Sequence, residues 1–80
     1  MTRGTVTKVV ISYGSKWGRI RPDDDVREIF FNFASLAEPS DFAAIEVGQA
    51  VEFDERPDHV NGSHAERLVL TKRLAVSNSG

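Results

Sequence analysis

The chain lacks cysteine altogether and has one tryptophan, one tyrosine and one methionine among its 80 residues. Without cysteine, neither a disulfide framework nor a zinc site with thiolate ligands can form. No apolar run approaches the roughly 18 residues of a membrane-spanning helix, and no apolar leader segment follows the first residues. We therefore expect a soluble, cytoplasmic protein with a single domain, since domains usually contain about 100–200 residues.

Acidic residues are absent from the first part of the chain. Residues 1–22 contain five basic residues and none of the 12 acidic ones, so this part carries +5 and the remainder −7, within a net charge of −2. The distribution of charge is more informative about partners than the total is. The basic segment therefore indicates an anionic partner.

Five short segments have the composition or the two-residue alternation of β-strands. Glycine, proline and aspartate separate them, as is typical of turns. We expect strands at residues 5–11, 16–21, 29–32, 50–54 and 63–71, with turns at 13–15, 22–25 and 57–62. Residues 34–47 predict a long loop with a short helical turn. Five short strands without a strong amphipathic helix predict an all-β fold, a small five-stranded antiparallel β-barrel of the OB type.

Alternation within the second and third strands assigns their side chains to two faces. Three apolar residues point to the core: Ile20, Ile29 and Phe31. The opposite face carries two aromatic rings, two arginines and an amide: Trp17, Arg19, Arg21, Phe30 and Asn32. Single-stranded nucleic acid binds to such surfaces, because bases stack on the rings and cations contact the phosphates. The alternative is that the two rings cover a sheet face beneath a loop.

The order of four segments resembles that of the cold-shock family, which includes the bacterial cold-shock proteins and the eukaryotic cold-shock domains. The segments are similar to the family's opening Gly-x-Val, its two RNA-binding motifs and its Gly-Gln-x-Val-x-Phe strand: Gly4-Thr5-Val6, Lys16–Pro22, Ile29–Phe33 and Gly48–Phe53. The resemblance implies a cold-shock-like domain over residues 1–71. Residues 72–80 then form a short C-terminal extension with a disordered end.

The resemblance also implies which residues contact the ligand. It places stacking rings at Trp17, Phe30 and Phe33, with Phe42 as the aromatic residue of the long loop and His64 at the edge of the binding face. Alternation alone would turn Phe33 into the core, whereas the family places this ring beyond the end of the strand. The implied partner is single-stranded RNA or DNA, without a cofactor. The implied role is that of an RNA chaperone or a regulator of transcription or translation.

Several positions depart from the family pattern. Lys8 and Val9 stand where the family has Trp and Phe, Arg19 replaces an aromatic residue, Asn32 replaces a His, and two residues are inserted before the first RNA-binding motif. Arginine can itself stack on a base, and Tyr13 in the insertion could supply another ring. The candidate nucleic-acid-binding residues are Lys8, Lys16, Trp17, Arg19, Arg21, Phe30, Asn32, Phe33, Phe42 and His64. These departures also motivate an alternative, a protein-interaction module that docks to a component of transcription or translation such as RNA polymerase or the ribosome.

Other constellations give no reason to expect an enzyme or a metal site. Asp23, Asp24, Asp25 and Glu28 lack the alternating ligand spacing of a calcium loop, which favours a solvated turn. His59 and His64 have no obvious third ligand. Residues 14–18 lack the Gly-Lys-Ser/Thr ending of a phosphate loop. No nucleophile stands beside a base, so we expect no catalysis, no metal and no cofactor.

Overall fold

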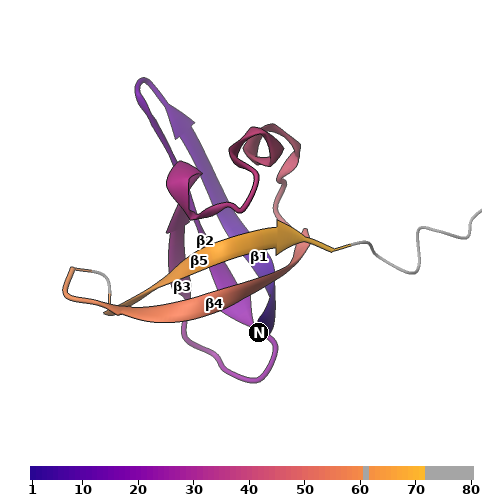
Figure 1. Cartoon of the computed structure of the whole chain (residues 1–80), viewed down its shortest axis with the longest axis vertical. Coiled ribbons are helices and arrows are strands. Elements are labelled where there is room, and N and C mark those ends of the chain that lie inside the picture. The colour runs from indigo at the N-terminus through magenta and orange to yellow at the C-terminus, as the bar shows by residue number, and fades with distance from the viewer. Residues whose placement is uncertain (61, 72–80) are drawn as a thin grey trace, which may run out of the picture.

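The computed structural model describes residues 1–60 and 62–71, and these form a closed five-stranded barrel (Figure 1). The strands follow the order β1-β2-β3-β5-β4 around the barrel. Their bounds are β1 (Thr2–Ser12), β2 (Ser15–Pro22), β3 (Ile29–Asn32), β4 (Ala50–Asp58) and β5 (Gly62–Leu70). The predicted all-β barrel is confirmed. The predicted C-terminal extension, residues 72–80, lies outside the described residues.

One strand pairing differs from the antiparallel barrel that the sequence predicted. β3 and β5 are parallel, whereas the four other neighbouring pairs are antiparallel. The number of strands explains the difference, since a closed ring with an odd number of strands cannot alternate direction at every pair. The parallel pair occurs where β5 returns beside β3 after the chain has crossed to β4.

The predicted strands are present, and four of the five extend beyond the predicted bounds at one or both ends. β1 and β2 form a long hairpin that projects from the barrel (Figure 1), with Tyr13 and Gly14 at its turn. Gly14 has a φ of 76°, a conformation that glycine adopts without a steric penalty. β4 continues through Pro57, where the sequence predicted a turn. Proline fits there because this position lies near the strand end, where it pairs with Ser63.

The long connection between β3 and β4 contains two short 3₁₀ helices, as the predicted loop with a helical turn implied. They are η1 (Phe33–Ser35) and η2 (Pro39–Ala44). A proline at the start of η2 suits the first turn of a helix, where its missing N–H is not needed. No helix of residues 1–60 and 62–71 has the length and apolar character to cross a membrane.

The core fills the inside of the barrel and continues under the two 3₁₀ helices. Ile20, Ile29 and Phe31 are fully buried, which confirms the predicted inward face of β2 and β3. The buried apolar residues are Val6, Ile20, Ile29, Phe31, Leu36, Phe42, Ile45, Val51, Phe53, Ala65 and Leu68.

A bulge in β1 reverses the faces of that strand halfway along it. Val6 pairs with Ile20 and Lys8 pairs with Arg19, so Thr7 is an extra residue in β1. Strict alternation from buried Val6 would turn Lys8 inward. Because of the bulge, Lys8 faces outward instead, and Val9 packs against the core.

Candidate nucleic-acid interface

One row of outward side chains crosses four strands of the barrel. Lys8 on β1 pairs with Arg19 on β2, which pairs with Phe30 on β3, and Phe30 pairs with His64 on β5. Directly paired residues project from the same face of a sheet. The structure therefore brings these four predicted site residues into one row.

A second row runs beside the first and carries the tryptophan. Trp17 pairs with Val10 on one side and with Asn32 on the other. The Trp17 ring stacks on the Phe30 ring of the first row, with centroids 5.7 Å apart and an angle of 25° between the planes. The two rings that alternation placed on one face thus form a continuous aromatic surface.

Two cations contact the tryptophan ring. Lys8 Nζ lies 5.4 Å and Arg19 Cζ lies 5.8 Å from the ring centroid of Trp17. Such cation–π contacts contribute only about 0.5–1 kcal/mol at exposed sites. An incoming base can therefore displace either cation from the ring, which leaves the cation free to contact a phosphate.

The basic residues of the predicted site differ from three other arginines, Arg3, Arg27 and Arg56, each of which forms an ion pair with a carboxylate. Arg3 binds Glu52 at 3.0 Å, and Arg27 binds Asp25 at 2.7 Å. Within residues 1–60 and 62–71, by contrast, the four basic site residues form no ion pair with a carboxylate: Lys8, Lys16, Arg19 and Arg21. Their charges remain available to an anionic ligand.

Phe33 lies beyond the end of β3, as the family resemblance implied. It begins η1, and 44% of its surface is exposed, whereas strict alternation would have placed it in the core. Lys16 Nζ lies 5.3 Å from the centroid of this ring. Alternation along β2 puts Lys16 on the opposite side of the hairpin from Trp17. This second ring and cation therefore form a separate cluster around the end of the barrel.

Phe42 is buried, so the expectation that it faces the ligand is wrong. Only 2% of its surface is exposed, and its ring centroid lies 5.8 Å from that of Phe31 and 6.4 Å from that of Phe33. The 3₁₀ turn of η2 directs the ring under the loop, where it completes the core of a small domain. Phe42 supports Phe33 from below and cannot stack on a base.

Asn32 has a structural role in addition to its place on the outward face. Its Oδ1 accepts hydrogen bonds from the Ala34 N–H at 2.9 Å and from Ser35 Oγ at 3.3 Å, while Ser35 Oγ accepts one from the Asn32 N–H at 3.0 Å. This reciprocal cap fixes η1 and the ring that begins it. The side-chain nitrogen of Asn32, Nδ2, donates no hydrogen bond within the described part of the chain.

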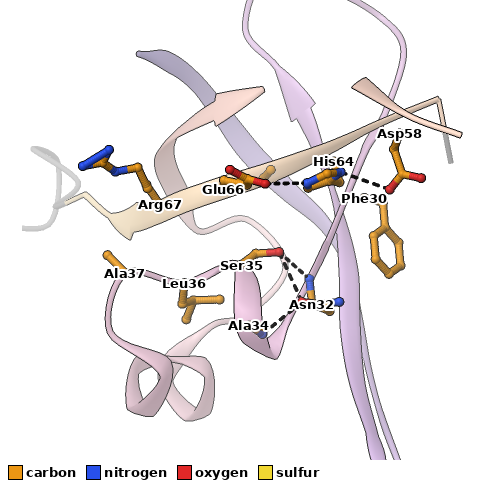
Figure 2. A pocket seen from close by; sticks show the side chains of 11 residues that line it. Phe30, Asn32, Ala34, Ser35, Leu36, Ala37, Asp58, His64, Glu66 and Arg67 are labelled. Carbon is orange, nitrogen blue, oxygen red and sulfur yellow. Dashed lines mark hydrogen bonds and ion pairs between the residues drawn. The ribbon is translucent and has the colours of Figure 1, made fainter. Parts of the chain in front are cut away.

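A hollow of about 520 Å³ lies beside the ring surface, between η1 and β5 (Figure 2). β3 contacts β5 where Phe30 pairs with His64. The segment after β3 then separates from β5, turns through η1, and meets β5 again where Leu36 pairs with Leu68, and the hollow lies between these two contacts. The lining combines apolar and charged side chains: Phe30, Asn32, Ala34, Ser35, Leu36, Ala37, Asp58, His64, Ala65, Glu66 and Arg67.

His64 lies at this hollow between two carboxylates. Its Nε2 is 2.9 Å from Glu66 Oε2, and its Nδ1 is 3.0 Å from Asp58 Oδ2 (Figure 2). The hydrogen bond to Glu66 and, after it, the one to Asp58 raise the pKa of His64 above its usual value, although partial burial opposes this. The doubly protonated ring donates to both carboxylates at once.

Sequence reasoning missed the charged neighbours of His64. Glu66 follows it by two residues, so alternation from His64 would have placed both on one face. Asp58 approaches from β4 through the strand pairing, and the sequence carries no signal for this contact. Arg67 also lines the hollow, because a positive φ of 53° breaks the alternation of β5 at this residue.

We expect the free energy of unfolding to decrease as the pH rises above about 6.5, the ordinary pKa of histidine. The folded state holds the His64 proton more tightly than the unfolded state does. The stabilisation is therefore complete below the unfolded pKa and is lost as the pH rises through the folded pKa. Urea unfolding between pH 6 and pH 9 measures it, and His64→Gln, which lacks the titrating ring, is the comparison. Equal pH dependence in both proteins would contradict this prediction.

The described residues include no cluster of three or more His, Cys, Asp or Glu side chains that could hold a metal ion. The sequence matches no family model and no curated protein. The relation to the cold-shock family therefore rests on the four segments and their order, and it stays a prediction.

Proposed function

We propose that this chain binds single-stranded RNA or DNA on the outward face of β1, β2 and β3, as an RNA chaperone or a regulator of transcription or translation. The observation that carries the proposal is the stacked pair of Trp17 and Phe30, with Lys8 and Arg19 beside it. Rings and unpaired cations on one surface are the two elements that sequence-tolerant single-strand binding requires.

The proposed mechanism is non-covalent and needs no cofactor. Unpaired bases stack on Trp17 and Phe30, each for about 1–3 kcal/mol, while the cations contact the phosphates that join them. The bases of a duplex are stacked and paired, so their faces are not accessible to the rings. A strand held in this way cannot pair with its complement, which is the action expected of an RNA chaperone.

Titration of tryptophan fluorescence tests the proposal at the site itself. Trp17 is the only tryptophan in the chain, so its emission reports on this surface alone. We expect single-stranded oligo-dT and oligo-U to quench the emission, and a duplex of the same length to quench it much less. Unchanged emission, together with no binding at low salt by an independent method, would contradict the proposal.

A second candidate function is docking to a protein of the transcription or translation machinery. The tip of the β1–β2 hairpin favours it, because Ile11 is 66% exposed and Tyr13 is fully exposed there. Both residues lie in or next to the turn of this hairpin, which projects from the barrel (Figure 1). Failure of the fluorescence titration would favour this function over the first.

A further inference from the structure

The hollow between η1 and β5 is continuous with the proposed stacking surface, and the proposed function does not account for it. Phe30 belongs to both, since its ring stacks on Trp17 and also lines the hollow. The volume of about 520 Å³ falls within the range of about 300–1,000 Å³ that is typical of small-molecule sites. A strand that lies on the two rings can therefore place its next base in the hollow.

The walls of the hollow suit the flat face of a base. Phe30, Ala34 and Ala37 supply accessible apolar surface, and Leu36 and Ala65 are buried beneath it. The charged groups of β5, Glu66 and Arg67, lie on one side, and Asn32 and Ser35 lie on the other (Figure 2). Polar groups beside apolar surface allow a protein to pack against the face of a bound ring and to form hydrogen bonds with its edge.

Glu66 provides hydrogen-bond acceptors and no donor at this edge. Its Oε1 accepts from Arg56 Nε at 3.3 Å, and its Oε2 lies 2.9 Å from His64 Nε2. These two contacts hold the carboxylate ionised, because they lower the pKa of Glu66, with His64 as the larger cause. Each carboxylate oxygen has a second lone pair, so the group can still accept hydrogen bonds from a ligand.

An ionised carboxylate discriminates between bases. Cytosine, adenine and guanine carry an exocyclic amino group, which donates to a carboxylate. Uracil and thymine present a carbonyl oxygen at the position where cytosine has its amino group, and their one donor on this edge, the N3–H, lies between two carbonyl oxygens that a carboxylate repels. The chemistry of the edge therefore favours a base with an amino group.

Arg67 stands at the rim of the same hollow in an unusual backbone conformation. Its φ of 53° lies in the left-handed region, which costs a residue other than glycine about 1–2 kcal/mol. Glu66 and Arg67 lie in the sequence between the buried residues Ala65 and Leu68. The unusual conformation lets both of them reach the hollow. Such outliers are concentrated at ligand sites. Within residues 1–60 and 62–71 the guanidinium forms no ion pair, and it points outward in Figure 2.

We propose that this hollow holds one nucleobase with an exocyclic amino group from the bound strand, with Glu66 accepting from the amino group and Arg67 contacting the adjoining phosphate. The inference rests on the proposed function, because the strand reaches the hollow from the rings. It adds a base preference to a surface that by itself is tolerant of sequence.

The test compares two RNA heptamers, oligo-C and oligo-U, on the full chain at pH 7.5. Their sugars and phosphates are identical, and the bases differ in the groups that face Glu66. We expect oligo-C to bind about tenfold more tightly. In Glu66→Gln, the ratio of the affinities for oligo-C and oligo-U should be close to one, since an amide can either accept a hydrogen bond or donate one. Glu52→Gln removes the same charge from β4, where Glu52 binds Arg3, and should leave the ratio unchanged.

Arg67→Gly tests the phosphate contact separately from the fold. Glycine adopts this φ without strain, so the variant should be at least as stable as the parent chain. It should bind both heptamers more weakly, with a salt dependence smaller by about 0.7 in the logarithmic slope. Equal affinity of the parent chain for the two heptamers, or an unchanged ratio in Glu66→Gln, would overturn the base assignment. Binding of neither heptamer would instead reject the proposed function, and the inference with it.

Discussion

Phe31→Ala unfolds the barrel or leaves it barely folded. The Phe31 ring is fully buried and packs beside the Phe42 ring, with the two centroids 5.8 Å apart. Its truncation should lower the free energy of unfolding by about 3–5 kcal/mol. Small domains have only about 5–15 kcal/mol in total, so this loss is a large fraction of the stability. Urea or thermal unfolding followed by circular dichroism measures it.

The neighbouring substitution Phe30→Ala has the opposite outcome. This ring lies on the outward face against Trp17, so its removal should cost only about 0.5–1.5 kcal/mol of stability. Binding of single strands should weaken by about 1–3 kcal/mol, the contribution of one stacked base. Phe30→Leu keeps an apolar side chain without a ring and is the matched control, which should lose binding in the same way. If Phe30→Ala unfolded while Phe31→Ala stayed folded without binding, the faces of β3 would be reversed.

Gly18→Ala should be the most disruptive change that adds a single methyl group. Gly18 pairs with Phe31 on the inner face, and a Cβ there would overlap the backbone carbonyl oxygen of Lys8 and approach Phe31 Cε1 to 2.7 Å. A backbone atom cannot rotate out of the way, so β1 and β2 must separate. We expect a loss at or above the upper end of the usual 1–3 kcal/mol for overpacking, about 3 kcal/mol.

Gly14→Ala provides the control for this substitution. Gly14 has a φ of 76° with nothing within 4 Å of the added Cβ, so alanine is strained there but does not collide. The expected loss is about 1 kcal/mol. Thermal unfolding of the two variants ranks them directly. A larger loss for Gly14→Ala than for Gly18→Ala would show that backbone conformation outweighs packing in this hairpin.

Five strand-like segments separated by turns were sufficient to predict the barrel, and alternation in β2 and β3 was sufficient to predict the faces of these two strands. Ile20, Ile29 and Phe31 are buried as expected, because a two-residue period and a small barrel leave one inner side. The bulge at Thr7 was not predictable in this way. It depends on how β1 pairs with β2, and nothing in the composition of β1 marks an extra residue.

The candidate site was predictable only where regular strands position it. Trp17 and Phe30 follow from alternation, whereas Phe33 needed the family resemblance because it lies in a 3₁₀ helix. Phe42 was misplaced because the resemblance supplied a residue type for the loop but no direction for its side chain. The hollow could not be predicted at all, since it depends on two distant pairings and on the positive φ of Arg67.

The pairing of Phe30 with His64 has a consequence for how the barrel opens. It is the one pairing of β3 with β5 among residues 1–60 and 62–71. Each of the other neighbouring strands is joined by four or more residue pairs, so the barrel is held together least extensively here. Local opening of a protein begins where few backbone contacts must break. Both residues of this contact lie on the proposed ligand surface, so a bound strand would bridge the opening, and separation of β3 from β5 would release it. Amide exchange at this junction and occupancy of the surface should therefore vary together.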